Sequence, residues 1–367
     1  MAFSSRASIA VDARLIGASG IGTYLRELLP RLISARDYLR FTLLGPGSTL
    51  SGLAWTRAPN VQVVGLEAPI YSVREQLALP LTIPTGTDVF WSPHYNIPLA
   101  WRGRLIATIH DLAHLALPEL VAGAHRRAYA RFMFGQVARR ADAIIAVSDF
   151  TRTEFERLVG SRRASPEVIH SGVDNRWFHL PPSRSPHQAP YLLYVGNVKP
   201  HKNLGRLLEA FSRVASRISW DLLILGKDEG FLNGDRTVRA AADRLAPRVQ
   251  MLGSLHQDLL EQYLAHAGAL VLPSLYEGFG LPPLEAMACG RPVIVSGAAS
   301  LPEICGDAAI YCDPLDPASI ASAIVQAHDD PALRETLRGR GLDRARQFTW
   351  ERSAQSTLTL LDRVLGA

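Results

Sequence analysis

Two glutamates separated by seven residues, Glu277 and Glu285, flank a turn rich in glycine and proline, and these residue types suit the binding of a phosphorylated polyol. We expect Glu277 in the loop, because Gly278, Gly280 and two prolines interrupt any helix there. A helix over residues 284–289 would place Glu285 in its first turn, where a carboxylate can accept two hydrogen bonds from a vicinal diol such as a ribose. The N–H groups before the helix would bind phosphate oxygens. The alternative is a surface turn followed by a capped helix.

All three lysines of the chain follow apolar, strand-like runs within a few residues. Lys199 and Lys202 come after residues 191–195, and Lys227 comes after residues 220–225. Loops at the carboxyl ends of parallel strands form the ligand crevice of an open α/β sheet. Ammonium groups there would balance a diphosphate whose charge grows as a bond to it breaks. For Lys227 the simpler expectation is a solvated loop lysine.

Histidines end two of the expected strands in the first half of the chain. His110 follows the apolar run 105–109, at the place where a catalytic group belongs in an α/β sheet. Asp111 would orient the His110 ring or cap the next segment. His94 ends another strand, and we expect it to be a hydrogen-bonded loop histidine.

Two glycines, Gly20 and Gly22, come after the first expected strand and open a helix. Their amides could bind a phosphate or let an acceptor approach the backbone closely. The pattern is not the complete Gly-x-Gly-x-x-Gly fingerprint, because residue 25 is Leu. This departure argues against a nicotinamide-dependent enzyme.

Short apolar runs alternate with helical patterns along the whole chain, which predicts an α/β fold of two doubly wound halves with parallel sheets. Residues 180–190 contain four prolines and predict the linker between the halves. We therefore expect domains over 1–182 and 183–348. The expected strands are 9–12, 41–44, 61–64, 88–91, 105–109 and 143–147 in the first half, and 191–195, 220–225, 249–252, 269–272, 293–295 and 309–311 in the second.

The run over residues 277–288, Glu-Gly-Phe-Gly-Leu-Pro-Pro-Leu-Glu-Ala-Met-Ala, resembles the retaining glycosyltransferases of family 4, which have the GT-B fold. The resemblance covers the second half fully and the first half more thinly. It implies two Rossmann-like domains that face each other across a cleft, with a last helix, 349–367, crossing back to the first domain. Further matching segments are 194–203, 224–226, 292–296, 301–303 and 348–350, and in the first half 20–24, 109–111, 147–148 and 170–174.

The resemblance gives the second half a donor-binding role. Lys202 would bind the phosphates, Glu285 the ribose and Glu277 the transferred sugar. The family commonly has Arg where this chain has Asn197, so either Lys199 or His201 would supply the second phosphate-binding group. The other donor-binding residues implied by the resemblance are Gly196, Gly278, Phe279, Gly280 and Leu281.

The resemblance gives the first half a catalytic and acceptor-binding role. His110 would touch the transferred sugar at the reaction centre and act with Glu277 as a catalytic residue. Gly20, Gly22 and Asp111 would line the acceptor side of the cleft.

The implied reaction moves a hexose from a nucleotide sugar to a hydroxyl of a glycan or lipid-linked acceptor, with retention of configuration, in surface polysaccharide biosynthesis. GDP-mannose is the first expected donor and a UDP-hexose the second. We expect neither a cofactor nor a metal, because lysines and helix amides take the place of a cation and no Asp-x-Asp cluster occurs. A front-face route is expected, in which the leaving phosphate takes the acceptor proton. A phosphorylase or epimerase, a non-catalytic nucleotide-sugar sensor and a dehydrogenase are the alternatives.

Composition is that of a globular protein, with 367 residues, 47% of them apolar and 20% charged. The three cysteines have no metal-ligand spacing and predict small core residues in a reducing cytosol. Asp12 and Arg14 interrupt the chain start too early for a secretory signal, and no apolar run has the length of a membrane span. We therefore expect a cytoplasmic protein.

Positive charge is concentrated in the first half: residues 1–180 carry a net +6 and residues 181–367 a net −1. Residues 124–140 combine Arg126, Arg127 and Arg131 with apolar residues at helical spacing. Such a helix would lie against the anionic inner face of a membrane or hold a lipid-linked phosphate, each arginine contributing about 1 kcal/mol. A solvated basic face over a core stripe is an equal alternative. The sequence has no basic–aromatic repeat of the kind that nucleic-acid modules use.

Overall fold

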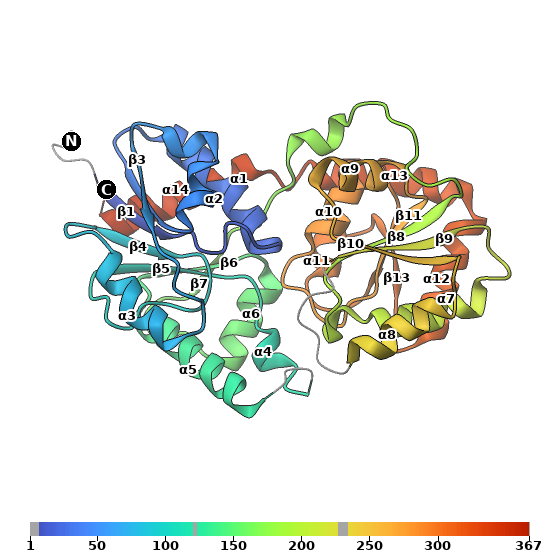
Figure 1. Cartoon of the computed structure of the whole chain (residues 1–367), viewed down its shortest axis with the longest axis horizontal. Coiled ribbons are helices and arrows are strands. Elements are labelled where there is room, and N and C mark those ends of the chain that lie inside the picture. The colour runs from blue at the N-terminus through green and yellow to red at the C-terminus, as the bar shows by residue number, and fades with distance from the viewer. Residues whose placement is uncertain (1–6, 120–122, 227–233, 367) are drawn as a thin grey trace. The chain divides into compact units, whose positions relative to one another are not determined.

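The structure is a computed structural model that describes residues 7–119, 123–226 and 234–366 (Figure 1). The chain divides into two compact units. Unit 1 comprises Met1–Gly172 and Trp350–Ala367, and unit 2 comprises Val173–Thr349.

The sheet of unit 1 contains the parallel strands β1 (Ser8–Asp12), β2 (Arg40–Gly45), β3 (Val61–Gly65), β4 (Val89–Ser92), β5 (Arg104–Ile109), β6 (Ala143–Ala146) and β7 (Pro166–Val168). Their order in the sheet is β3-β2-β1-β4-β5-β6-β7. The order reverses between β1 and β4, as in Rossmann folds, so a ligand is expected at the carboxyl ends of these two strands. Most strand residues are buried because helices cover both faces of a parallel sheet.

Helices cover both faces of this sheet, with α1 and α14 on one side and α3 and α5 on the other (Figure 1). The C-terminal helix belongs to unit 1, as the sequence predicted: Arg31 of α1 pairs with Glu351 of α14 at 2.8 Å. The helices of unit 1 are α1 (Gly20–Ala35), α2 (Gly47–Ser51), η1 (Ala54–Arg57), α3 (Val73–Thr82), α4 (Ala113–Ala116), α5 (Ala124–Arg140), α6 (Asp149–Leu158) and α14 (Trp350–Leu365).

Unit 2 repeats the same topology. Its parallel strands are β8 (Tyr191–Val195), β9 (Asp221–Leu225), β10 (Val249–Gly253), β11 (Ala269–Leu272), β12 (Val293–Ser296) and β13 (Ala309–Cys312). Their order is β10-β9-β8-β11-β12-β13, with the reversal between β8 and β11. A second ligand position is therefore expected at the carboxyl ends of β8 and β11.

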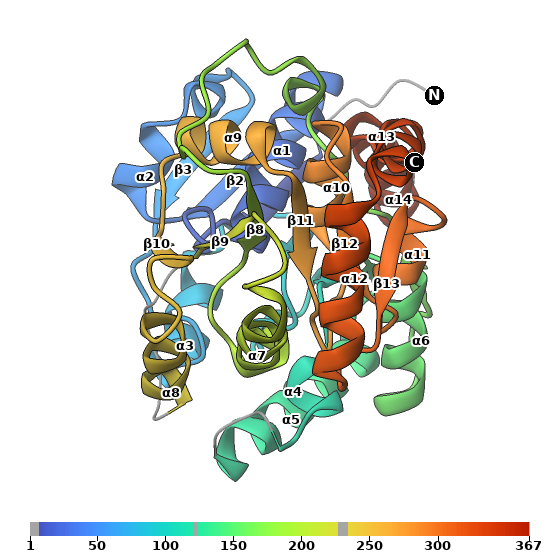
Figure 2. The ribbon, with the colours of Figure 1, turned by 90° about the vertical axis from the view of Figure 1, so that its right-hand side faces the viewer.

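The helices of unit 2 lie on both faces of its sheet, and Figure 2 shows α7 beside α12 on one of them. The second face carries α10 and α13, which pack on each other. The bounds are η2 (Asn175–His179), η3 (Pro200–Lys202), α7 (Leu204–Val214), α8 (Gly234–Asp243), α9 (Gln257–His266), α10 (Leu281–Ala288), α11 (Leu301–Cys305), α12 (Pro317–Asp329) and α13 (Pro331–Ala345).

The α/β class and all the expected strands are confirmed, whereas β7 was not predicted because it has only three residues. The boundary at 182/183 lies later than the division between the units. Residues before it pack on unit 2: Arg176 lies 3.6 Å from Glu261, and the Arg346 guanidinium lies over the Phe178 ring. No helix in the described part of the chain is both long and apolar enough to cross a bilayer.

Candidate active site

One polar cluster of unit 2 joins Lys202 to Glu277, two residues singled out from the sequence. Lys202 ends η3, which follows β8, and Glu277 lies in the loop between β11 and α10. Nζ of Lys202 donates to Oε1 of Glu277 at 2.6 Å and to Oε2 at 2.7 Å. Both groups thus lie at the carboxyl ends of β8 and β11, where the topology of unit 2 places its ligand site.

The carboxylate of Glu277 accepts a further hydrogen bond from Oγ of Ser274, at 2.7 Å from Oε1. The side chains of Lys202 and Glu277 are 17% and 10% exposed, so the pair is mostly shielded but open to a ligand. An ammonium group has three N–H donors, and two of them bind Glu277 here. The third remains available to an anion such as a phosphate oxygen.

The glycine-rich loop after Glu277 is held in place by contacts with Ser300, which is completely buried. Oγ of Ser300 lies 2.9 Å from the carbonyl oxygen of Glu277 and 2.8 Å from that of Phe279, and these two oxygens share its one O–H donor. Gly280 has φ +112°, and a Cβ there would lie 2.9 Å from the Leu301 side chain. Only glycine fits this position without strain.

The start of α10 differs from the prediction. The helix begins at Leu281, with Gly280 as its N-cap, so Glu285 lies in the second turn and not in the first. The prediction failed because prolines fit the second and third helical positions as well as the first, since N–H groups of the first turn have no partner within the helix.

The supply of free amides is also smaller than expected from the sequence. Two residues of the stretch 279–284 are prolines, and the N–H of Leu284 donates to the carbonyl oxygen of Gly280 at 3.4 Å. In the described chain, the N–H groups of Gly280 and Leu281 donate no hydrogen bond. These two are the amides that the helix start offers to an anion.

The other donor-side candidates surround this cluster in unit 2. Lys199 is exposed at the start of η3, while His201 is partly buried and its carbonyl oxygen accepts from the N–H of Leu275 at 2.7 Å. Gly196 comes directly after β8 and packs against Gly226, which comes directly after β9. A Cβ on Gly226 would lie only 2.0 Å from the carbonyl oxygen of Gly196. Lys227 lies outside the described residues.

In unit 1, His110 follows β5, as the sequence predicted, and the residue is partly buried. Its Nε2 lies 3.0 Å from the carbonyl oxygen of Pro93, which can only accept, so Nε2 carries the proton. Burial lowers the pKa of His110 to about 4. The neutral ring therefore keeps an unprotonated Nδ1 that can accept a hydrogen bond from a hydroxyl group.

The remaining unit 1 candidates have structural roles at the same edge. Asp111 is exposed, and its Oδ1 accepts from the N–H of Ala113, the first residue of α4, at 3.0 Å. Gly20 is exposed at the start of α1. Gly22 is required for close packing, because a Cβ there would lie 2.8 Å from the carbonyl oxygen of Ile16.

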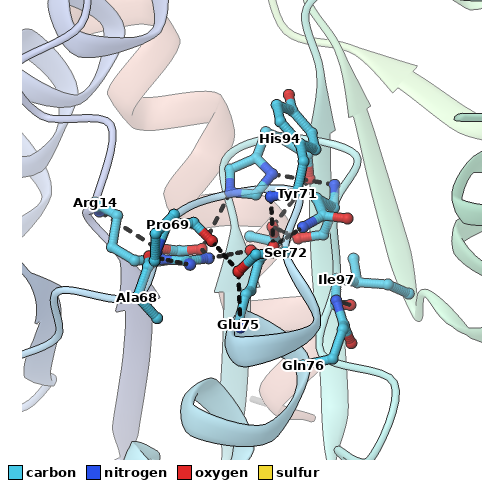
Figure 3. A network of polar contacts seen from close by, with 12 residues as sticks. Arg14, Ala68, Pro69, Tyr71, Ser72, Glu75, Gln76, His94 and Ile97 are labelled. Carbon is cyan, nitrogen blue, oxygen red and sulfur yellow. Dashed lines mark hydrogen bonds and ion pairs between the residues drawn. The ribbon is translucent and has the colours of Figure 1, made fainter. Parts of the chain in front are cut away.

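Sequence reasoning missed a buried charge network at the carboxyl ends of β1 and β4 (Figure 3). Arg14 binds both oxygens of Asp12, at 2.8 and 2.5 Å, and also binds Glu75 of α3. Oδ2 of Asp12 lies 3.0 Å from Nε2 of His94. Oε2 of Glu75 accepts from the side chain of Asn96.

The charges of the network are shielded from solvent. Asp12 and Glu75 are completely buried, and Arg14 is 8% exposed. Burial alone would raise the pKa of Asp12, but the hydrogen bonds from Arg14 and His94 outweigh it and hold this pKa well below its usual range. Asp12, Glu75 and His94 have the spacing of a metal site, yet the Arg14 guanidinium binds both carboxylates and already supplies the positive charge.

The sequence carried one usable signal for this network. Asp12 and His94 each end or follow an apolar strand, and carboxyl ends of neighbouring parallel strands meet at one edge. His94 was expected to be a hydrogen-bonded loop histidine, and its contacts confirm that role. Arg14 and Glu75 lie far apart in the chain, and only the folded structure brings them together.

Comparison with known proteins relates both units to one family. Residues 18–177 match the family model described as Glycosyltransferase Family 4, and residues 189–330 match the model described as Glycosyl transferases group 1. The O-antigen chain mannosyltransferase B of Escherichia coli is 31% identical over 93% of this chain and 95% of its own length.

Two solved structures share the fold. Sucrose-phosphate synthase from Thermosynechococcus elongatus superposes with a TM-score of 0.80 and 22% identity, over 98% of this chain and all of its own. The Anabaena protein HepE, solved in complex with UDP-glucose, superposes with a TM-score of 0.78 and 19% identity, over 97% of this chain and 99% of its own.

Proposed function

This chain belongs to the family 4 glycosyltransferases, and from that premise we propose that it transfers mannose from GDP-mannose to a hydroxyl of a glycan or lipid-linked acceptor. It is a glycosyltransferase of polysaccharide biosynthesis. The observation that carries the proposal is the Lys202–Glu277–Ser274 cluster at the ligand edge of unit 2, with contacts of 2.6 to 2.7 Å. The sugar identity is supported by the mannosyltransferase that is 31% identical to this chain.

Donor binding is assigned to unit 2. The free N–H of Lys202 and the amides of Gly280 and Leu281 would hold the diphosphate, with Lys199 or His201 as the second cationic or donor group. Glu277 would bind a hydroxyl of the sugar. Glu285, one turn into α10, would reach the ribose. Because Lys202 contacts Glu277 directly, a bound donor would share one ammonium between its phosphate and the carboxylate.

Acceptor binding and catalysis are assigned to the edge of unit 1 that carries His110, Asp111, Gly20 and Gly22. Nδ1 of His110 would accept a hydrogen bond from a hydroxyl of the sugar at the reaction centre. The neutral ring does not repel a developing positive charge on the sugar, whereas a protonated ring would.

We propose that the reaction follows a front-face route with retention. The bond between the anomeric carbon and the phosphate oxygen breaks, the acceptor oxygen bonds the same face of the anomeric carbon, and its proton moves to the departing phosphate. Three hydrogen bonds from Lys202 and Ser274 stabilise the negative charge of Glu277 and make it a weak nucleophile. This speaks against a covalent intermediate on that residue. A mannosylated Glu277 peptide, trapped from a quenched reaction and identified by mass spectrometry, would contradict the front-face route.

A thermal-shift screen across nucleotide sugars tests the donor. GDP-mannose at a hundredfold excess over its dissociation constant should add about 2.7 kcal/mol of stability. The matched variants are Lys202→Met, which should lose this shift, and Arg213→Met, at an exposed position of α7, which should keep it. A stability increase with a UDP-hexose, and none with GDP-mannose, would make the UDP-hexose the donor in this proposal. No response to any nucleotide sugar would overturn the proposal.

Product analysis separates an enzyme from a sensor. With GDP-mannose and a glycolipid extract, we expect GDP release that depends on the extract, and a product whose anomeric configuration by NMR matches that of the donor. Donor binding without acceptor-dependent GDP release would indicate a sensor. Release or rearrangement without any acceptor would indicate a phosphorylase or an epimerase.

A further inference from the structure

Helix α3 exposes three of its large apolar side chains and buries a carboxylate, which is unusual for a surface helix. Val73, Leu77 and Leu81 are 80%, 66% and 87% exposed. They are four residues apart, so they form one stripe along the helix. On the opposite side, Glu75 and Leu79 are completely buried.

The orientation of α3 is fixed by the buried network, so the stripe cannot turn inward. The side chain of Glu75 binds Arg14 and Asn96 and accepts from the N–H of Tyr71 at 2.7 Å. Rotation of the helix would cover the two leucines, but it would take Glu75 away from Arg14, Asn96 and Tyr71 and expose the buried Leu79. A buried arginine that loses one of its carboxylates is strongly destabilising.

Exposed apolar side chains in the described part of unit 1 are concentrated on this region. The large ones are Tyr71, Val73, Leu77, Leu81 and Phe132, which lie on α3, on the residues before it, and on α5. In unit 2, by contrast, the exposed large apolar residues are Leu259, Tyr311 and Leu315, which lie on three different segments.

Helices α3 and α5 are neighbours on one face of the sheet (Figure 1). Gln76 of α3 accepts from the N–H of Leu99, and Arg140 of α5 donates to the carbonyl oxygen of the same residue. The rings of Tyr71 and Tyr129 also meet edge to face, with centroids 6.3 Å apart. The residues before α3 and helix α5 therefore meet on the face of unit 1 that carries the apolar stripe.

The exposed charges on α3 and α5 themselves are positive, although the exposed Asp111 lies close enough to Tyr71 to act on it. Arg74, Arg126, Arg131 and Arg139 are exposed on the two helices. The only acidic residue of α3 or α5 is Glu75, whose charge is buried and paired. An apolar stripe bordered by arginines matches an anionic lipid surface, with hydrocarbon below and phosphates above.

We propose that the α3 stripe inserts into the interfacial layer of an anionic phospholipid bilayer, with the arginines of α5 on the lipid phosphates. The sequence suggested a membrane contact through Arg126, Arg127 and Arg131 of α5. The structure adds the apolar element, because α5 exposes only Phe132 among its large apolar residues. A second copy of the chain is the less favoured occupant, since a symmetric interface through this region would place arginines against arginines.

Vesicle flotation tests the proposal. The full chain should float with vesicles of phosphatidylglycerol and phosphatidylcholine, and should not float with phosphatidylcholine alone. The double variant L77Q/L81Q should reduce partition about tenfold or more, because two exposed leucines no longer enter the bilayer. The matched control is Leu315→Gln, in unit 2, whose leucine is 63% exposed and whose substitution should leave partition unchanged.

The arginines have their own test. R126Q/R131Q should weaken binding to the anionic vesicles and flatten its salt dependence, whereas R184Q, at an exposed position in unit 2, should do neither. Inorganic phosphate at the same concentration as the lipid should not compete, because the site is a surface and not a pocket. Equal flotation of wild type and L77Q/L81Q would overturn the proposal. Dimerisation of the wild type that is lost in L77Q/L81Q, measured by sedimentation without lipid, would assign the stripe to a second copy and overturn it also.

Discussion

The two units place charged residues at equivalent edges of equivalent sheets, but they hold them differently. In unit 2 the Lys202–Glu277 pair is partly open, and one N–H of its ammonium remains for a ligand. In unit 1 the Arg14 network is closed, because Asp12, Glu75 and His94 are almost without exposure. The open pair can exchange partners when a substrate binds. The closed network fixes the positions of the segments around it, including α3.

The largest expected effect lies in the closed network. Arg14→Met removes the shared partner of Asp12 and Glu75, and two buried carboxylates then lack their cation. We expect the free energy of unfolding to fall by about 3–5 kcal/mol, measured by urea denaturation. Arg213→Met is the matched control, because the Arg213–Glu209 pair has side chains 46% and 53% exposed and should change stability by less than about 1 kcal/mol. An equal fall in the free energy of unfolding for Arg14→Met and Arg213→Met would mean that the buried network stabilises the fold no more than an exposed ion pair does.

The open pair should lose more in turnover and less in stability than the closed network. Glu277→Gln keeps the shape of the side chain but removes the charge that binds Lys202 and the sugar hydroxyl. Turnover with GDP-mannose should fall about 10²–10³-fold, and the free energy of unfolding should fall by about 1–3 kcal/mol, because Lys202 keeps some contact with water. Glu209→Gln, on the exposed face of α7, should leave both unchanged. A Glu277→Gln enzyme with normal turnover would show that the pair is only structural.

The same contrast explains what the sequence could predict. The strands were found because each is one short apolar run, and Glu277 was found because its glycine-rich turn and helix start are contiguous. Lys202 was placed by its position after β8. The Arg14 network combines residues from three separate segments, and each of them has an ordinary local explanation. No local pattern encodes such contacts.

The error at Glu285 has a more specific origin. Its helix could begin before or after the proline pair, because neither proline loses a helical hydrogen bond in the first turn. The local sequence therefore did not determine the first residue of α10, and the prediction placed it three residues too late. The packing of the loop on Ser300 and Leu301, which no nearby residue reveals, decides where the helix starts.

His110 offers a comparison by pH. Its pKa is lowered by burial to about 4, whereas an unfolded histidine titrates near 6.5, so the unfolded chain binds more protons between these values. His110 therefore makes the fold less stable as the pH drops from about 6.5 to 4, by ~3 kcal/mol at most. Urea denaturation at pH 4.5, 5.5 and 7 should show a smaller fall for His110→Gln than for the wild type. Asp12 also lowers the stability of the fold in acid, but both proteins contain it, so its contribution is the same in each. An equal fall in the free energy of unfolding in the two proteins would therefore mean that His110 is not buried as a neutral ring.

The smallest expected effect tests the backbone of the open site. Gly280→Ala places a Cβ 2.9 Å from Leu301 at a φ of +112°, and should lower the free energy of unfolding by about 1–2 kcal/mol while raising KM for the donor. Gly339→Ala is the control, because Gly339 lies inside α13 with no atom within 4 Å of the added Cβ. That substitution should raise stability by about 0.5–1 kcal/mol and leave KM unchanged. A loss of stability with a raised KM in Gly280→Ala, and neither in Gly339→Ala, would show that donor binding depends on the backbone geometry of this turn. A normal KM for Gly280→Ala would mean that the turn does not contact the donor.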